Sequence, residues 1–222
     1  MSHLLGAFVF LFLGGVLILR GRNNPAGLPY LVVYAVSVVV VMLASSLFHM
    51  SERGSPVHRI FERLDHSAIF LFIAGTFTPS LGILFHGWWR WLPLVIIWTA
   101  AIVGVTLKSI FFEYVGDGLG LALYLSMGWF GSYSGVLLAW RYGFNFVKPL
   151  VLGGAAYSIG GVIDLMRSWT FIPGVIHMHE LFHITVLMGA FWHWLFIWQF
   201  ANGGPALRGR GKTGLGQPAA AP

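Results

Sequence analysis

Long apolar blocks separated by short polar connections divide the chain, and this pattern limits its fold more than any other feature of the sequence. We count seven blocks, which run over residues 4–19, 28–49, 66–85, 91–107, 119–140, 149–166 and 179–201. Most approach the ~20 residues that an α-helix needs to cross a hydrocarbon core of about 30 Å. The sequence therefore predicts an all-α fold, a seven-transmembrane helical bundle.

The composition excludes a soluble globular domain. Of the 222 residues, 57% are hydrophobic and only 9% are charged, whereas a soluble domain usually carries about 25% charged residues. The net charge of +6 does not indicate a nucleic-acid partner. The lysines and arginines lie in short loops and a tail, where membrane proteins carry topology signals and contacts to anionic lipids. The chain has no cysteine, so it can form neither a disulfide nor a thiolate metal site.

The blocks predict two parts, a seven-helix transmembrane domain over residues 1–202 and a tail over residues 203–222. The tail is basic and rich in Gly, Pro and Ala, so we expect it to be disordered and to face lipid head groups. The first block could instead be a signal peptide, but it lacks a basic segment before it and a clear cleavage site after it. Arg20 and Arg22 follow it directly, as flanking charges follow a retained span. We therefore expect a retained helix.

Three histidines lie at span ends on one side of the membrane. His49 ends the second block, and His179 and His183 begin the seventh. Because successive spans alternate in direction, these ends share one membrane face. His179 and His183 are four residues apart, which places both rings on one helix face about one turn apart. A single histidine at a helix end is usually just interfacial, but three at one depth favour a metal site.

The three imidazoles suit a zinc ion held near one membrane face. The pair on the seventh helix can supply two ligands of a tetrahedral Zn²⁺, and His49 can supply the third. Three histidines with an open fourth position are typical of a catalytic zinc, which lowers the pKa of its bound water to about 7.

Two further polar residues are predicted to act at this site. Ser45 lies one turn before His49 on the same helix face, and Asp65 immediately precedes the third block. We predict that the Ser45 hydroxyl orients the water or the ligand and that Asp65 serves as general acid or base. The alternatives are a packing role for Ser45 and an N-cap role for Asp65. Residues left without an assigned role near the metal are His66, Asp164 and His177.

The stretch from His179 to His183 also matches the zinc-protease pattern H-E-x-x-H, in which Glu180 would be the general base. Matches of five residues are common by chance. On a helix Glu180 is rotated ~60° from the nearer histidine, which favours a solvated side chain at the interface. The sequence leaves the role of Glu180 open.

Several motifs around these residues resemble the hemolysin III family, the bacterial branch of the progestin and adipoQ receptors, which includes the adiponectin receptors. They occur in order along the second to seventh helices. The matching stretches are Ser45-Ser46-Leu47-Phe48-His49, Leu64-Asp65-His66-Ser67-Ala68-Ile69-Phe70, Ile73-Ala74-Gly75-Thr76-Phe77-Thr78-Pro79, Gly153 to Gly161 with Tyr157, and the His179–His183 pair.

The resemblance implies a seven-helix protein of the bacterial inner (plasma) membrane with a buried Zn²⁺ bound by His49, His179 and His183. It also implies that Ser45 and Asp65 surround the zinc-bound water. The wider superfamily includes alkaline ceramidases, which hydrolyse a lipid amide. The family name comes from a cytolytic phenotype of some members.

Three functions therefore remain open. The first is a zinc-dependent hydrolase that acts on an amide or ester of a sphingolipid-like or other acyl lipid in the membrane. The second is a receptor or signalling protein with a structural zinc. The third is a membrane-lytic protein, which the near absence of charged residues from the middles of the blocks disfavours.

The sequence also leaves the membrane orientation open. On the side of the three histidines lie five basic residues, Arg53, Arg59, Arg63, Lys108 and Arg167, and on the other side lie eight, Arg20, Arg22, Arg90, Arg141, Lys148, Arg208, Arg210 and Lys212. The positive-inside rule would place the histidines outside, although three of the eight lie in the tail. The adiponectin receptors, whose zinc lies at the cytosolic face, favour the opposite orientation.

Overall fold

The computed structural model describes residues 2–166, 170–172 and 176–204, with the backbone alone for residues 170–172 and 176–177. The helices of this part are α1 (Ser2–Gly21), α2 (Leu28–Met50), α3 (Pro56–Leu84), α4 (Trp88–Ile110), α5 (Asp117–Phe130), α6 (Ser132–Tyr142), α7 (Phe144–Leu165) and α8 (Met178–Trp198), with a 3-10 turn η1 at Phe112–Tyr114. A short antiparallel pair, β1 (Thr170–Ile172) and β2 (Ile176–His177), connects α7 to α8. Most of the predicted tail, residues 205–222, lies outside the described residues.

The described helices include seven spans long and apolar enough to cross a membrane, with α5 and α6 together forming one of them. Large apolar side chains point outward along these spans; on α1, for example, Leu5, Phe8 and Phe12 are 68%, 65% and 71% exposed. A water-soluble surface rarely carries so many contiguous apolar groups, whereas a lipid-facing surface requires them. The predicted seven-span all-α fold is therefore confirmed.

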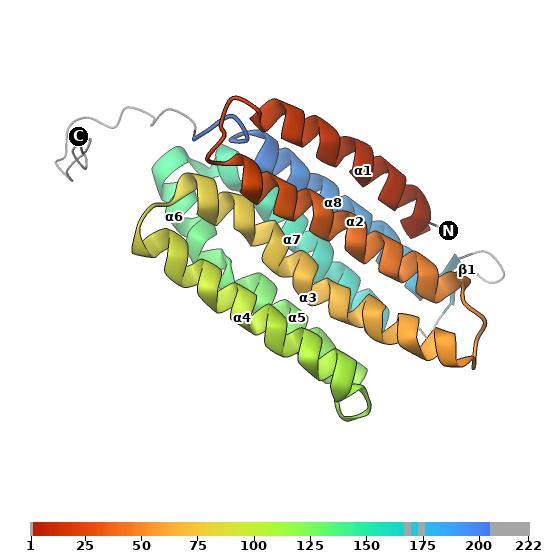
Figure 1. Cartoon of the computed structure of the whole chain (residues 1–222). Helices are drawn as coiled ribbons and strands as arrows, with labels where there is room; N and C mark the ends of the chain where they lie inside the picture. The colour runs from red at the N-terminus through yellow and green to blue at the C-terminus, as the bar shows by residue number, and fades with distance from the viewer. Residues whose placement is uncertain (1, 167–169, 173–175, 205–222) are drawn as a thin grey trace, which may run out of the picture.

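The spans pack as a bundle in which chain neighbours lie side by side from α1 to α4 (Figure 1). Helix α8 contacts α7 and also α1 and α3, so the last span closes the bundle against the first. Apolar side chains between these helices, among them Phe10, Tyr34, Phe72 and Phe196, form the main core. This closure brings the start of α1 to the end of the bundle where α2 ends and α8 begins, which we call the site end (Figure 1).

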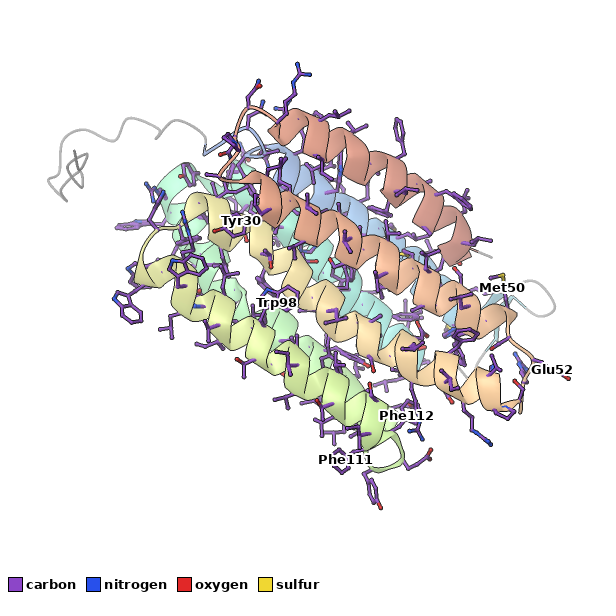
Figure 2. All side chains as sticks on the ribbon, viewed as in Figure 1. Tyr30, Met50, Glu52, Trp98, Phe111 and Phe112 are labelled. Atoms are coloured by element: carbon purple, nitrogen blue, oxygen red, sulfur yellow. The ribbon has the colours of Figure 1, made fainter. Side chains whose placement is uncertain are left out.

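Figure 2 shows Met50, Glu52 and Phe112 at the site end and Tyr30 at the other, which we call the opposite end. The site end holds the C-termini of α2, α4 and α7 and the N-termini of α1, α3, α5 and α8. This is the arrangement that the alternation of seven spans predicts.

The third helix begins earlier than predicted. It starts at Pro56, where the predicted apolar block began at His66. Its N-cap is Ser55, whose Oγ accepts a hydrogen bond from the backbone N–H of His58 at 3.0 Å. The alternative interpretation of Asp65 as an N-cap is therefore wrong. The first turns of α3 are too polar to register as an apolar block, although their backbone is helical.

The fifth span is broken, whereas the sequence predicts a single helix. Helix α5 ends at Phe130, Gly131 separates the two segments, and α6 begins at Ser132. A Cβ atom at Gly131 would collide with the ring of Phe77 on α3. The glycine therefore allows α3 to approach at the break, and a bulkier residue would not fit.

Candidate metal centre

Two helices supply the three predicted metal-binding histidines. His49 lies in the last turn of α2, while His179 and His183 lie in the first two turns of α8. The ring centroids are 4.8 Å apart for His49 and His179, 4.9 Å for His49 and His183, and 4.5 Å for His179 and His183. One ligand nitrogen from each ring lies within 4.8 Å of the other two. The structure thus brings together side chains that are 130 residues apart in the sequence.

The arrangement of nitrogen atoms fits a metal ion. The Nε2 atoms of His179 and His49 are 3.0 Å apart. The Nδ1 atom of His179 donates a hydrogen bond to the Oδ1 atom of Asp164 at 3.0 Å, which leaves the Nε2 lone pair facing His49. Two ring nitrogens at this distance require a proton or a cation between them. Tetrahedral zinc with Zn–N bonds of ~2.0–2.1 Å places its ligand nitrogens roughly 3.3 Å apart, close to the observed spacing.

Asp164 is the residue that orients His179. It is the penultimate residue of α7, and its carboxylate reaches the histidine across the connection to α8. Metal-binding histidines usually donate their second N–H to a carboxylate or carbonyl, which fixes the tautomer and the ring orientation. The sequence placed Asp164 at the correct membrane face but left its role open. The structure places it in contact with one of the three histidines.

Ser45 and Asp65 lie beside the histidine cluster. Ser45 is one turn before His49 on α2, and its side chain is 3% exposed. The carboxyl group of Asp65 lies close enough to Ser45 and His179 to interact with both. A hydroxyl from α2 and a carboxylate from α3 therefore adjoin the histidines on α2 and α8. This set can bind a cation and can handle a proton next to it.

Helix α1 adds two residues that sequence reasoning missed. The Nδ1 atom of His3 lies 2.8 Å from the Oγ atom of Ser45, and the His3 ring stacks on His183 with centroids 3.8 Å apart. The Oγ atom of Ser2 lies 3.2 Å from the Nδ1 atom of His183. Because successive spans alternate in direction, the first span must begin at the same end as the other histidines. Counting spans in the sequence could therefore have identified His3.

His3 is also incompletely hydrogen bonded. Its side chain is 6% exposed, and its buried Nε2 atom has no hydrogen-bond partner among the described residues. Buried polar atoms are almost always satisfied, so such an atom at the edge of a candidate metal centre marks a position where a water molecule or ligand would be favoured.

Other polar residues of the chain lie outside the cluster. His66 bonds through its Nδ1 atom to the carbonyl of Glu62, and its ring faces Phe112. Glu180 is exposed. His193 lies deeper in the bundle, where its Nδ1 atom donates to the carbonyl of Gly189 at 2.9 Å. The side chain of His177 lies outside the described residues.

Comparison with known proteins gives one family and several relatives. The family model described as Haemolysin-III related matches residues 1–194. Hemolysin-3 of Bacillus cereus is 37% identical over 166 residues, which cover 71% of this chain and 68% of that protein. A Hemolysin-3 homolog of Bacillus subtilis (strain 168) is 35% identical over 167 residues, with coverage of 71% and 70%. The adiponectin receptor protein of Drosophila melanogaster is 25% identical over 220 residues, covering 87% of this chain and 48% of the receptor.

Proposed function

The chain belongs to the haemolysin-III-related family, and from this premise we propose that it is a zinc-dependent hydrolase that cleaves an amide or ester bond of a membrane lipid. Its seven apolar spans make it an integral, multi-pass membrane protein, and its bacterial relatives indicate the plasma membrane. The observation that carries the proposal is the convergence of three histidine rings with a carboxylate and a hydroxyl from two different helices beside them.

Zinc is the metal that this donor set favours. Three neutral imidazoles with no thiolate suit zinc and other borderline metals better than Mg²⁺ or Ca²⁺, which prefer oxygen ligands. Three protein ligands also leave one position of a tetrahedral ion open, as in catalytic zinc sites. A structural site would be expected to fill all four positions with protein side chains.

A bound zinc ion would supply Lewis-acid polarisation of a carbonyl group and a lowered pKa for coordinated water. The protein contributes orientation and proton handling. Asp164 holds His179 with its Nε2 lone pair turned toward His49. Asp65 would accept a proton from the attacking water and return it to the leaving group, and Ser45, held by His3, would keep the Asp65 carboxyl group in position.

The surroundings of the site favour a lipid substrate. His49 is exposed while His183 is buried, so one side of the histidine cluster is open. On the same helix end Leu47 and Met50 are 42% and 51% exposed and offer an apolar surface next to His49. A substrate arriving from the bilayer could lie along these side chains with its amide or ester group at the histidines.

The test is lipid hydrolysis by purified protein of known metal content. Ceramide and phospholipid vesicles would be incubated with zinc-loaded protein, and released fatty acid would be measured by mass spectrometry. We expect the wild type to release fatty acid from at least one lipid class. We expect Asp65→Asn to release it at least about 100-fold more slowly, which is the size of a general acid–base contribution. A zinc-loaded wild type that releases fatty acid from neither lipid class would refute the proposal.

The relatives named Hemolysin-3 make membrane lysis the second candidate function. If lysis depends on hydrolysis, dye release from liposomes should disappear in a His49→Ala variant that still inserts normally. Dye release at the wild-type rate by this variant would favour a purely lytic protein. A protein that holds zinc but neither hydrolyses nor lyses lipid would favour the receptor alternative suggested by the Drosophila relative.

A further inference from the structure

The charges of the bundle are separated between its two ends. All seven acidic residues of the chain are among the described residues, and all lie at the site end: Glu52, Glu62, Asp65, Glu113, Asp117, Asp164 and Glu180. The opposite end therefore carries basic residues without any aspartate or glutamate side chain within reach, since a membrane span of roughly 30 Å separates the two ends.

A cavity of about 360 Å³ opens at this opposite end. It lies between the α1–α2 connection, the end of α3, the start of α4, the end of α6 and the segment after α8. Its basic lining residues are Arg90, Arg141 and His86. The volume falls within the range of roughly 300–1,000 Å³ that is usual for small-molecule sites.

The two arginines are placed to bind an anion. Arg90 lies in the first turn of α4, where its Nε atom donates to the carbonyl of Phe85 at 2.8 Å and so anchors the guanidinium group. Arg141 lies at the end of α6, with its guanidinium carbon 5.5 Å from the ring centroid of Tyr142. Two guanidinium groups that line one cavity can bind a phosphate with charge-assisted, bidentate hydrogen bonds.

The position of the cavity along the membrane normal indicates the source of the phosphate. Arg90 lies within a run of tryptophans, and Trp88, Trp89 and Trp91 are 81%, 63% and 55% exposed. Exposed tryptophans of membrane proteins collect at the level of the lipid head groups. Basic pockets between helices at this level bind the head groups of anionic lipids.

A second cavity, at the site end, differs in charge. It has a similar volume and is lined by Leu47, Met50, Ser51, Glu52, Ser55, Val57 and Phe61. Its charged lining residue is an acid, which would repel a phosphate.

We infer that the cavity lined by Arg90, Arg141 and His86 binds the phosphate of an anionic phospholipid head group. This site lies a full span away from the histidine cluster and uses none of its residues. It holds a lipid at the end of the bundle where α3, α4 and α6 meet, and so ties these helices to the membrane surface.

The test measures lipid binding by the full chain in detergent. Native mass spectrometry detects bound lipid as the protein is titrated with phosphatidylglycerol or phosphatidylcholine. We expect wild-type protein to prefer phosphatidylglycerol and the Arg90→Gln/Arg141→Gln variant to bind it at least about tenfold more weakly, as expected for loss of a charge-assisted pair. The matched control, Arg22→Gln/Lys148→Gln, removes the same charge at the same end from exposed residues outside the cavity. It should retain wild-type affinity within about twofold, because neither residue lines the cavity.

A single-residue variant and a competition with inorganic phosphate make the result decisive. Arg141→Gln alone changes an exposed residue at a helix end, so it should fold normally and still weaken phosphatidylglycerol binding. Inorganic phosphate at millimolar concentration should fail to displace the lipid. Displacement by inorganic phosphate would assign the cavity to a soluble anion and overturn the lipid assignment. Equal lipid binding by the cavity variants and the control, or no preference for phosphatidylglycerol in the wild type, would overturn the site itself.

Discussion

The Nδ1 atom of His3 lies 2.8 Å from the Oγ atom of Ser45, and this contact joins α1 to α2 inside the candidate metal centre. On its other side the His3 ring stacks on His183. His3 therefore fixes both a hydroxyl group next to Asp65 and one of the three rings that would hold the metal. It contacts the site but is not one of the three histidines whose ring nitrogens could hold the metal.

We expect His3→Ala to weaken zinc binding by on the order of tenfold, the lower part of the range for residues that support metal ligands. Zinc affinity would be measured by competition with a chelator. His3→Phe keeps a ring against His183 and His3→Gln keeps a polar group for Ser45, so the two variants separate stacking from hydrogen bonding. His86→Ala, an exposed histidine at the opposite end, is the control. Unchanged affinity in His3→Ala would show that α1 only packs against the site.

The histidines themselves should account for the metal. Purified wild-type protein should contain about one zinc ion per chain. His179→Ala or His183→Ala should remove most of it, because a site with only two histidine ligands binds zinc more weakly and no longer defines its coordination geometry. Metal analysis by mass spectrometry measures this directly. Zinc-free wild type, or full zinc occupancy in the His179→Ala/His183→Ala double variant, would contradict a histidine site.

Asp164 should tune the metal through His179. We expect Asp164→Asn to weaken zinc binding by about 10- to 100-fold, since the amide no longer fixes the tautomer that turns Nε2 toward His49. Chelator competition measures the change. Glu180→Gln, which alters an exposed carboxylate adjacent to His179, should bind zinc like the wild type. Equal losses in both variants would indicate a general effect of negative charge.

Asp65 and Glu180 should differ in their contribution to catalysis. Asp65→Asn should retain zinc and folding but lose lipid hydrolysis, because the amide preserves shape and removes proton transfer. Glu180→Gln should keep most of the activity. Fatty-acid release at matched zinc content is the measurement. The reverse result would support the H-E-x-x-H protease interpretation and remove the proposed role of Asp65.

Two adjacent glycines of α7 should respond in opposite directions to the same substitution. A Cβ atom at Gly153 would collide with the ring of His193, whereas at Gly154 it would meet nothing within 4 Å. We expect Gly153→Ala to destabilise the protein by about 1–3 kcal/mol. We expect Gly154→Ala to stabilise it by roughly 0.5–1 kcal/mol through helix propensity. Thermal melting in detergent compares the two, and equal shifts would show that α7 and α8 do not pack closely at Gly153.

Much of the fold and of the candidate site follows from the sequence. Hydropathy defines the spans because each must bury its backbone in helical hydrogen bonds across the bilayer. The number of spans between two residues then determines whether they lie at the same membrane face. This is why His49, Asp65, Asp164, His179 and His183 could be assigned to one end before any contact was known.

Other features needed the packed bundle. Hydropathy places a residue along the membrane normal, but it does not say which helices are lateral neighbours. That choice depends on small residues and side-chain fit, because no hydrophobic effect drives helices together in lipid. The contact of α1 with α2 and α8 brings His3 to Ser45 and His183, and the approach of α3 to Gly131 accompanies the break between α5 and α6.

The sequence by itself therefore determined the spans, their alternation and the membrane depth of the histidines. The tertiary structure decided the partners at that depth, namely Asp164 for His179 and His3 for Ser45. It also decided that the basic residues of the opposite end include two arginines around a cavity. Depth is set by the transfer of apolar groups into lipid, residue by residue, whereas partners within one layer are set by close packing among helices distant in the chain.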